Sequence, residues 1–298
     1  MSNSSIAVDG QPRKTRQQDS NAVLRTANHT WSSILITEQE TVLEELAEKC
    51  HATRELAWGN YIVPGINCKE YEQRFVNSKC VHYQNRKEVA RTAHPHSRIP
   101  LLSREFRYSP PRRLDNPQRR AAVALDCEMI GVLGIGNAQS ELVQLCAVDF
   151  LTGEVLIDKY VVPTREVVDW RTRYSDVTES LLEQKKAEGQ TLNGWREEEL
   201  WMYVDEDTIL VGHALNNDLE ALRMVHTRVV DSAILTKKAV SCYCYRTWKL
   251  KALCQELLGK EVQNDAAARH DCLEDTFAAR DVVLFCIQYH DKLEAWAS

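Results

Sequence analysis

The stretch that decides the fold is AAVALDCEM, residues 121–129, a nearly continuous apolar run that contains two acids. Such a run is typical of a buried β-strand. Because side chains alternate between the two faces of a strand, Asp126 and Glu128 are expected on the same face. Two like charges in so apolar a strand are unfavourable unless something neutralises them, and a divalent cation would do so. The alternative is a solvent-facing strand edge, because a single Asp-x-Glu triplet is weak support by itself.

The residues that follow have the pattern of an α/β domain. The strands that we expect are residues 121–129, 142–150, 155–162, 208–212 and 229–230. The helices that we expect lie near residues 176–186 and 195–204, from about residue 216, and over 248–258 and 272–288. Three clustered strands followed by alternating helices and strands predict an α/β fold class, with a mixed five-stranded sheet flanked by helices.

The chain before this domain divides into two further regions. Residues 1–30 are polar and aperiodic, and we expect a disordered tail. Residues 31–118 are expected to form a smaller, mostly helical or irregular region that ends in a proline-rich linker. Residues 119–298 are expected to form the main domain.

One helix start in the N-terminal region has a recognisable signal. Thr37 and Glu40 have the spacing of a capping box, which predicts that a helix begins there. Val42, Leu46, Cys50 and Ala57 would lie near one face of this helix.

Composition excludes several classes of protein. The chain has 298 residues, 44% hydrophobic and 27% charged, with a net charge of −6, as expected of a soluble globular protein. No run approaches the roughly 20 apolar residues of a membrane helix, and the N-terminus lacks the apolar core of a secretory signal. We therefore expect a cytoplasmic or nuclear protein that is not secreted and has no membrane partner, with its ten cysteines reduced.

Charge is distributed unevenly along the chain. Residues 1–118 carry a net charge of +4 and the remainder −10, while residues 73–120 alone carry +9. A basic segment that guides a nucleic acid to an acidic catalytic domain is one explanation, and a solvated linker is the other.

A second acidic element is VGHALNNDL, residues 211–219, which has the pattern of a strand, a turn and a helix start. Asn216 is a suitable N-cap, which would place Asp218 in the first helical turn. Taken alone, Asp218 could simply favour the helix dipole.

The third acidic element is HDCLED, residues 270–275. Asp271 and Glu274 have the spacing of a capping box, so we expect Asp271 to be the N-cap. His270 and Asp275 then occupy positions that lie side by side in a hydrophobic staple, and this geometry predicts an imidazole near a carboxylate. The alternative is a surface histidine beside a helix start.

Together the three elements supply four carboxylates and one imidazole. Hard oxygen ligands without clustered cysteines or histidines suit Mg²⁺ or Mn²⁺ better than zinc. Four carboxylates are enough to hold two such ions about 3.5–4 Å apart, the arrangement used to cleave phosphodiesters. A neutral histidine with a pKa of about 6.5 could take a proton from the attacking water.

In their order and their strand and helix contexts, these elements resemble the three motifs of the DEDDh 3′→5′ exonuclease superfamily. Two further stretches, DKYVVPT at residues 158–164 and DWRTRYS at residues 169–175, are similar to a eukaryotic subgroup. It comprises the RNA exonucleases that trim ribosomal RNA precursors and the interferon-stimulated antiviral exonuclease. The resemblance covers residues 121–288.

This resemblance implies a ribonuclease-H-like fold and 3′→5′ hydrolysis that releases 5′-mononucleotides. The metal ligands that it implies are Asp126, Glu128, Asp218 and Asp275. It further implies that His270 is the general base and that Met129 lies against the terminal nucleotide. Where relatives usually have Ser-Gly-Ile, this chain has Ser175-Asp176-Val177, which puts local substrate contacts in doubt but not the chemistry.

Other contacts with substrate are less well defined. His213 belongs to the second element and is a candidate for substrate binding. Arg171, Arg173 and Arg246 are candidates for phosphate contacts, with ordinary surface arginines as an equal alternative.

A zinc site in the N-terminal region has weaker support. Cys68, Cys80 and His82 resemble the end of a small finger, but Tyr71 stands where a second cysteine would be expected. Structural zinc sites need four ligands in tight pairs, so a degenerate finger or ordinary core cysteines are the better interpretation.

The function that we expect is that of an active, metal-dependent 3′→5′ exonuclease whose substrate is the 3′ end of a single-stranded RNA. The resemblance also implies ribosomal RNA processing and a nuclear or nucleolar location. Three alternatives remain open. They are an inactive exonuclease fold that binds RNA or a protein partner, a structure-specific endonuclease, and an exonuclease that prefers single-stranded DNA. The sequence does not predict the oligomeric state.

Overall fold

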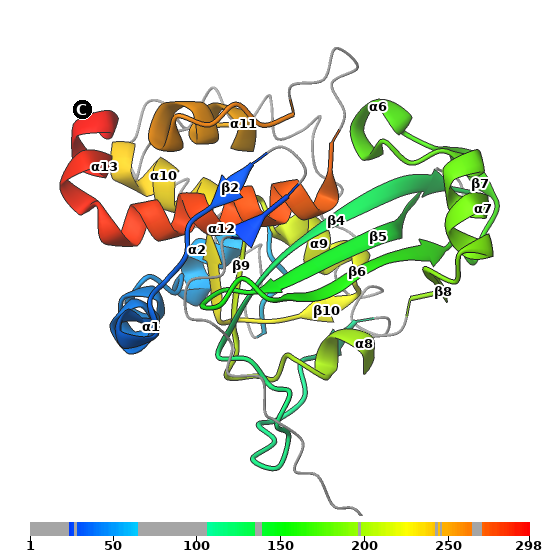
Figure 1. Cartoon of the computed structure of the whole chain (residues 1–298), viewed down its shortest axis with the longest axis horizontal. Helices are drawn as coiled ribbons and strands as arrows, with labels where there is room; N and C mark the ends of the chain where they lie inside the picture. Colours follow the sequence, from blue (N-terminus) through cyan, green and yellow to red (C-terminus); the bar gives the residue numbers. More distant parts are fainter. Residues whose placement is uncertain are drawn as a thin grey trace, which may run out of the picture.

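The structure is a computed structural model that describes residues 24–26, 29–64, 106–134, 139–195, 198–241, 244, 246–263 and 270–298. Within these residues the chain forms a seven-stranded sheet flanked by helices (Figure 1). Its strands are β4 (Ala122–Val132), β5 (Gln139–Asp149), β6 (Val155–Val162), β7 (Val167–Asp169), β8 (Thr191–Asn193), β9 (Ile209–Gly212) and β11 (Val229–Asp231). Their order is β11-β9-β4-β5-β6-β8, and β7 pairs with the far end of β4.

The sheet is mixed, as the sequence predicted. β4 is antiparallel to β5, and β5 to β6, whereas β9 is parallel to β4, β11 to β9, and β8 to β6. The expected number of five strands is wrong because β7 and β8 were missed. Each has three residues, which is too short for an alternating pattern to show in the sequence.

The two faces of β4 pack against different layers. Ala122 and Ala124 belong to a core shared with α12 (Cys272–Gln288), whereas Val123 and Leu125 belong to a core shared with α9 (Asn216–Ala221). Figure 1 shows α12 running across the sheet. Because side chains alternate, the next two residues of the α12-facing row are the two acids of the strand.

The remaining elements cover the sheet and its ends. The helices are α1 (Gln39–Glu48), α2 (Thr53–Trp58), α6 (Thr172–Ser175), α7 (Glu179–Ala187), α8 (Glu198–Trp201), α10 (Ser232–Val240), α11 (Leu250–Leu253) and α13 (His290–Ala297). The short strands are β1 (Leu24–Arg25), β2 (Thr30–Trp31), β3 (Arg107–Tyr108) and β10 (Met224–Val225). A π-helical turn at Cys254–Leu258 continues α11 and ends at Gly259, whose φ is 63°.

Among the described residues, every helix is too short or too polar to cross a membrane.

The described part of the N-terminal region packs directly on the main domain. α1 places Val42 and Leu46 in the α12-side core, and α2 places Leu56 in the α9-side core. The expected capping box at Thr37 is wrong, because Thr37 lies inside a 3₁₀ turn and α1 begins only at Gln39. The single expected helix is two helices, since the chain turns at residues 49–52.

The proline-rich segment also lies along the domain. β3 pairs with β10, and Ser109 Oγ lies 2.7 Å from His226 Nδ1. The Pro110 carbonyl accepts a hydrogen bond from Glu206 N at 2.9 Å. Residues 107–110 are therefore attached to the main domain rather than separated from it.

Candidate active site

Asp126 and Glu128 lie where β4 passes the N-terminus of α12. Glu128 is only 7% exposed and lies opposite Gln144 of β5, and Asp126 is half-buried opposite Cys146. The Asp126 carbonyl accepts a hydrogen bond from Cys272 Sγ at 3.3 Å, which ties the strand to the start of the helix. A β-bulge between Glu128 and Met129 bends the strand immediately after the second acid.

Asp218 is brought to β4 by the turn between β9 and α9. Its Oδ1 accepts a hydrogen bond at 2.9 Å from the main-chain nitrogen of Cys127, which stands between the two acids of β4. Asp218 lies in the first helical turn, as predicted, and is 5% exposed. The expected N-cap is wrong, because Asn216 is already helical and Leu215 precedes it without a side-chain cap.

Asp231 holds this turn and was missed in the sequence. Its carboxylate accepts hydrogen bonds from Ala214 N at 2.9 Å and Leu215 N at 3.1 Å, and from Tyr61 Oη at 2.6 Å. Ala214 has a φ of 54°, which is costly for a residue with a Cβ, so the turn needs this support. The signal was available, since an aspartate after an apolar strand is a typical N-cap, here of α10.

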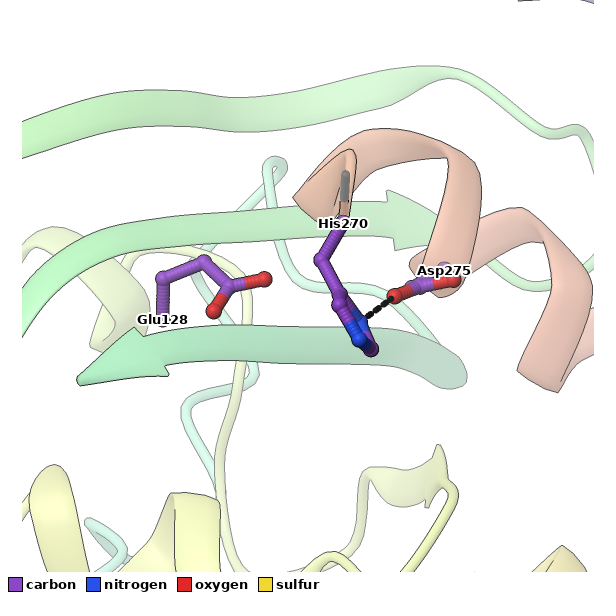
Figure 2. Close-up of side chains that lie close together, drawn as sticks. All are labelled: Glu128, His270 and Asp275. Carbon is purple, nitrogen blue, oxygen red and sulfur yellow. Dashed lines mark hydrogen bonds and ion pairs between the residues drawn. The ribbon is translucent and has the colours of Figure 1, made fainter. Parts of the chain in front are cut away.

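The start of α12 carries the remaining acid and the histidine. Asp271 is the N-cap, as predicted, and accepts hydrogen bonds from Leu273 N at 3.0 Å and Glu274 N at 3.1 Å. His270 Nδ1 lies 2.9 Å from Asp275 Oδ2, which confirms the predicted contact between imidazole and carboxylate. Figure 2 shows this pair and, across from it, Glu128 extending from β4 towards His270.

Burial, together with the charges of neighbouring acids, raises the pKa values of Asp126, Glu128 and Asp218. Burial, followed by the charges of Asp275 and Asp218, raises the pKa of Glu128 to about 9. Burial also raises the pKa of Asp218 to about 8, against the opposing effect of the hydrogen bond from Cys127. The pKa of Asp126 lies well above its ordinary value because of burial and the charges of Asp218, Glu128 and Asp275. The fully ionised cluster therefore needs positive charge to be stable.

This arrangement fits a metal ion. One ligand atom each from Glu128, His270 and Asp275 lie within 4.8 Å of one another. Asp126 and Asp218 are near enough for their charges to act on the same cluster. Buried carboxylates with raised pKa values and few compensating hydrogen bonds are an environment that a divalent cation stabilises.

Comparison with known proteins identifies the family. A family model described as "Exonuclease" (RNase_T) matches residues 123–283, more than half of the chain. The chain belongs to the exonuclease family. The predicted resemblance to DEDDh exonucleases is thereby confirmed.

Two proteins illustrate the similarity of this exonuclease in sequence. RNA exonuclease 3 of Candida albicans is 33% identical over 166 residues, which are 56% of this chain and 38% of that protein. Small RNA degrading nuclease 2 of Arabidopsis thaliana is 34% identical over 177 residues, 56% of this chain and 35% of that protein. The matched region is thus little more than a third of the length of either relative.

A solved structure shares the fold. The catalytic unit of Neurospora crassa Pan2, which has protease and nuclease domains, superposes with a TM-score of 0.50 at 23% identity. The match covers 65% of this chain and 34% of that chain. The predicted ribonuclease-H-like fold class, a mixed sheet flanked by helices, is confirmed by this similarity.

Gln263 is the second residue of the site that the sequence did not indicate. Its Nε2 donates to Asp275 Oδ1 at 2.9 Å and Oδ2 at 3.0 Å, and lies 3.1 Å from His270 Nδ1. Its backbone has a φ of 58°. No helix or strand pattern passes through this position, so periodicity could not have found it.

The candidate substrate residues lie in different surroundings. His213 Nδ1 lies 2.8 Å from Ser232 Oγ, and burial lowers the pKa of the imidazole, so this histidine is neutral at pH 7. Arg171 donates to Ser140 Oγ at 2.9 Å, and Arg173 is exposed on α6. Arg246 stacks on Trp248 with its guanidinium 4.9 Å from the ring centre. Met129 is half-buried after the bulge and packs against the α9-side core.

A cavity of about 350 Å³ adjoins the site between the start of α12, β6 and the loop after α6. Tyr160, Lys185, His270 and Asp271 are among its lining residues. So is Asp176, whose φ of 52° lies in the region that glycine prefers. Its carboxylate contributes to the raised pKa of Glu128. The aspartate at this position therefore adds negative charge to the cleft.

The residues considered as zinc ligands lie outside the described residues. These are Cys68, Cys80 and His82. The cysteines within the described residues are free thiols.

Proposed function

We propose that this protein is a metal-dependent 3′→5′ exonuclease that acts on RNA and releases 5′-mononucleotides. The observation that supports this most strongly is the convergence of Asp126, Glu128 and Asp218 with Asp275 beside His270. Three separate parts of the chain bring these carboxylates together although their charges repel. Such a cost in stability is expected where a cluster serves a cation and catalysis. The names of the relatives, RNA exonuclease and small RNA degrading nuclease, favour RNA as the substrate.

The metal ions would be Mg²⁺ or Mn²⁺, two of them, held by the four carboxylates. Oxygen ligands of this kind suit these hard cations. When bound, the ions would supply charge stabilisation for the phosphate that is attacked and for the leaving oxygen.

His270 has the geometry of a general base. A carboxylate only accepts hydrogen bonds, so the short contact with Asp275 Oδ2 requires the hydrogen of His270 on Nδ1. Nε2 is then the nitrogen that can take a proton from water. Asp275 holds the ring in this orientation and stabilises the positive charge that appears when Nε2 is protonated.

The substrate would be the 3′ end of a single-stranded RNA. We assign Met129 and His213 to the terminal nucleotide and Arg171 and Arg173 to phosphates, with single-stranded DNA as the alternative substrate. Processing of ribosomal RNA precursors in the nucleus or nucleolus remains a proposal that rests on the family resemblance. We place the exonuclease domain at residues 119–298, preceded by the 1–30 tail and the 31–118 region.

The test is cleavage of 5′-labelled RNA with a free 3′-hydroxyl. We expect a ladder that shortens from the 3′ end in Mg²⁺ or Mn²⁺ and no cleavage in EDTA. A 3′-phosphate should block or slow the reaction, and a matched DNA strand measures the preference for RNA. Binding of RNA without cleavage would favour an inactive binding module, internal cuts an endonuclease, and mononucleotides released from the 5′ end would contradict the polarity.

A further inference from the structure

The N-terminal ribbon, defined as β1, β2 and the adjacent described residues Thr26, His29 and Ser32, contacts α12. Trp31 is 3% exposed and stacks on Phe277, with ring centres 5.9 Å apart. Ser32 donates from its main-chain nitrogen and its Oγ to Asp281 Oδ2, at 2.9 and 2.8 Å. Figure 1 shows β2 lying over α12. These contacts fix the ribbon beside the turn of the helix that carries Asp275.

His29 connects this ribbon to Glu274. Its Nδ1 lies 2.8 Å from Glu274 Oε1, and the carboxylate residue is 4% exposed. Because a carboxylate only accepts, His29 must be the donor. Glu274 was expected to turn back onto the backbone of Asp271 in a capping box, and here its two oxygens face His29 and Gln263 instead.

Glu274 in turn holds Gln263. Its Oε2 accepts a hydrogen bond from Gln263 N at 3.3 Å, and the Gln263 carbonyl accepts one from Lys251 Nζ at 2.9 Å. These two contacts fix a main chain that has left-handed φ. The Gln263 side chain is thereby directed at Asp275 and His270.

We propose that His29 is a positioning residue of the active site, which acts through Glu274 and Gln263 to hold Asp275, the partner of His270 Nδ1. The inference rests on the proposed function for its effect on cleavage, whereas the coupling between these side chains is a property of the protein alone. Removing His29 leaves one oxygen of a buried carboxylate without its donor, and Glu274 must then shift towards other partners. Gln263 N loses its acceptor in consequence, and the loop that orients Asp275 becomes free to move.

The experiment compares four variants, His29→Ala, His29→Asn, Gln263→Ala and the double variant His29→Ala/Gln263→Ala. Ser32→Ala is the matched control, since it removes a hydrogen bond between the same ribbon and α12 further from Asp275. In single-turnover cleavage of 3′-hydroxyl RNA we expect His29→Ala to lower the rate roughly 10- to 100-fold, as misplacement of catalytic groups does. KM should change little, His29→Asn should restore much of the rate because its amide keeps a donor, and Ser32→Ala should affect only thermal stability.

The double variant tests the relay, by which we mean the coupling from His29 through Glu274 and Gln263 to Asp275. If His29 acts through Gln263, the double variant is no slower than Gln263→Ala alone, whereas independent roles would multiply the two losses. Equal rate losses in Ser32→Ala and His29→Ala would overturn the proposal, and so would multiplicative losses in the double variant. If His29→Ala does not fold, His29→Leu with and without Gln263→Ala decides the same question, because leucine fills the space of the imidazole but has no donor.

A second readout does not depend on catalysis. In the metal-free protein, amide hydrogen exchange over residues 272–276 should be faster in His29→Ala and in Gln263→Ala, and unchanged in Ser32→Ala. Unchanged exchange in His29→Ala contradicts the relay. If the wild-type protein does not cleave RNA but the variants show this pattern of exchange, the proposed function is contradicted. The coupling of His29 to Asp275 through Glu274 and Gln263 is then still supported.

Discussion

The two sides of the active site are supported in different ways. Asp126 and Glu128 sit on β4, which pairs with β5 along both acids, and Asp218 is joined to the same strand by a main-chain hydrogen bond from Cys127. Asp275 and His270 lie at the start of a helix, where the side chain of Gln263 donates to Asp275 and Asp275 in turn holds His270. Main-chain support follows from the fold, whereas side-chain support depends on individual residues. The positions of Asp275 and His270 should therefore be more sensitive to distant substitutions than those of Asp126, Glu128 and Asp218.

The largest effect is expected for Asp218→Asn. Cleavage should be abolished, because a ligand charge is lost, while the metal-free protein should become more stable, because one repelling buried charge is removed. Single-turnover kinetics and thermal unfolding in EDTA measure the two effects. A variant that loses activity only because it unfolds would contradict the assignment.

His270→Ala should have the next largest effect. The rate should fall about 10²–10⁴-fold, the usual contribution of a positioned general base. The acidic limb of the pH–rate profile should flatten, and the helix start should persist because Asp271 still caps it. Circular dichroism checks the fold, and a wild-type rate with an unchanged profile would exclude the general-base role.

The positions of Asp126, Glu128 and Asp218 could largely be predicted from the sequence. The residues that hold Asp275 and His270 in place could not. The alternation of β4 and the order strand, turn, helix placed Asp126, Glu128 and Asp218 because these patterns are local. The pairing of His270 with Asp275 followed from cap spacing, which is also local. His29 contacts Glu274 across 245 residues of sequence, and Gln263 reaches Asp275 from a position outside any helix or strand, so no local pattern records either contact.

The stability of the metal-free protein should depend on pH through the cluster. Glu128, at about 9, and Asp218, at about 8, have folded-state pKa values above their ordinary ones. The folded state therefore binds more protons than the unfolded state between about pH 4 and 9, and stability falls as pH rises through this window. Thermal unfolding in EDTA measures the slope. Saturating Mg²⁺ or Glu128→Gln should reduce it, and a rise in stability with pH would contradict the repulsion.

Tyr61→Phe tests how Asp231 holds the turn that brings Asp218 to β4. The variant removes one donor to the buried Asp231 and should cost about 1–3 kcal/mol of unfolding free energy. The cleavage rate should change little, because Ala214 N and Leu215 N still bind the same carboxylate. Urea unfolding and kinetics provide the two numbers. A rate loss as large as that of His29→Ala would remove the distinction between the two sides.

The smallest effect is expected for Asp176→Asn in the loop beside the cleft. Asparagine tolerates the left-handed backbone, so the fold should be unchanged while a negative charge near Glu128 is lost. KM for RNA should fall a few-fold at low salt, with the difference shrinking as salt screens the charge. A higher KM would instead assign Asp176 a favourable contact with the substrate.

Calorimetric titration of Mn²⁺ into the metal-free protein tests the central claim most directly, namely that the converging carboxylates form a metal centre. The account predicts binding of two ions to the wild type, loss of tight binding in Asp218→Asn, and retained binding in Tyr61→Phe. Equal stoichiometry and affinity in wild type and Asp218→Asn, or no binding to the wild type at all, would contradict it.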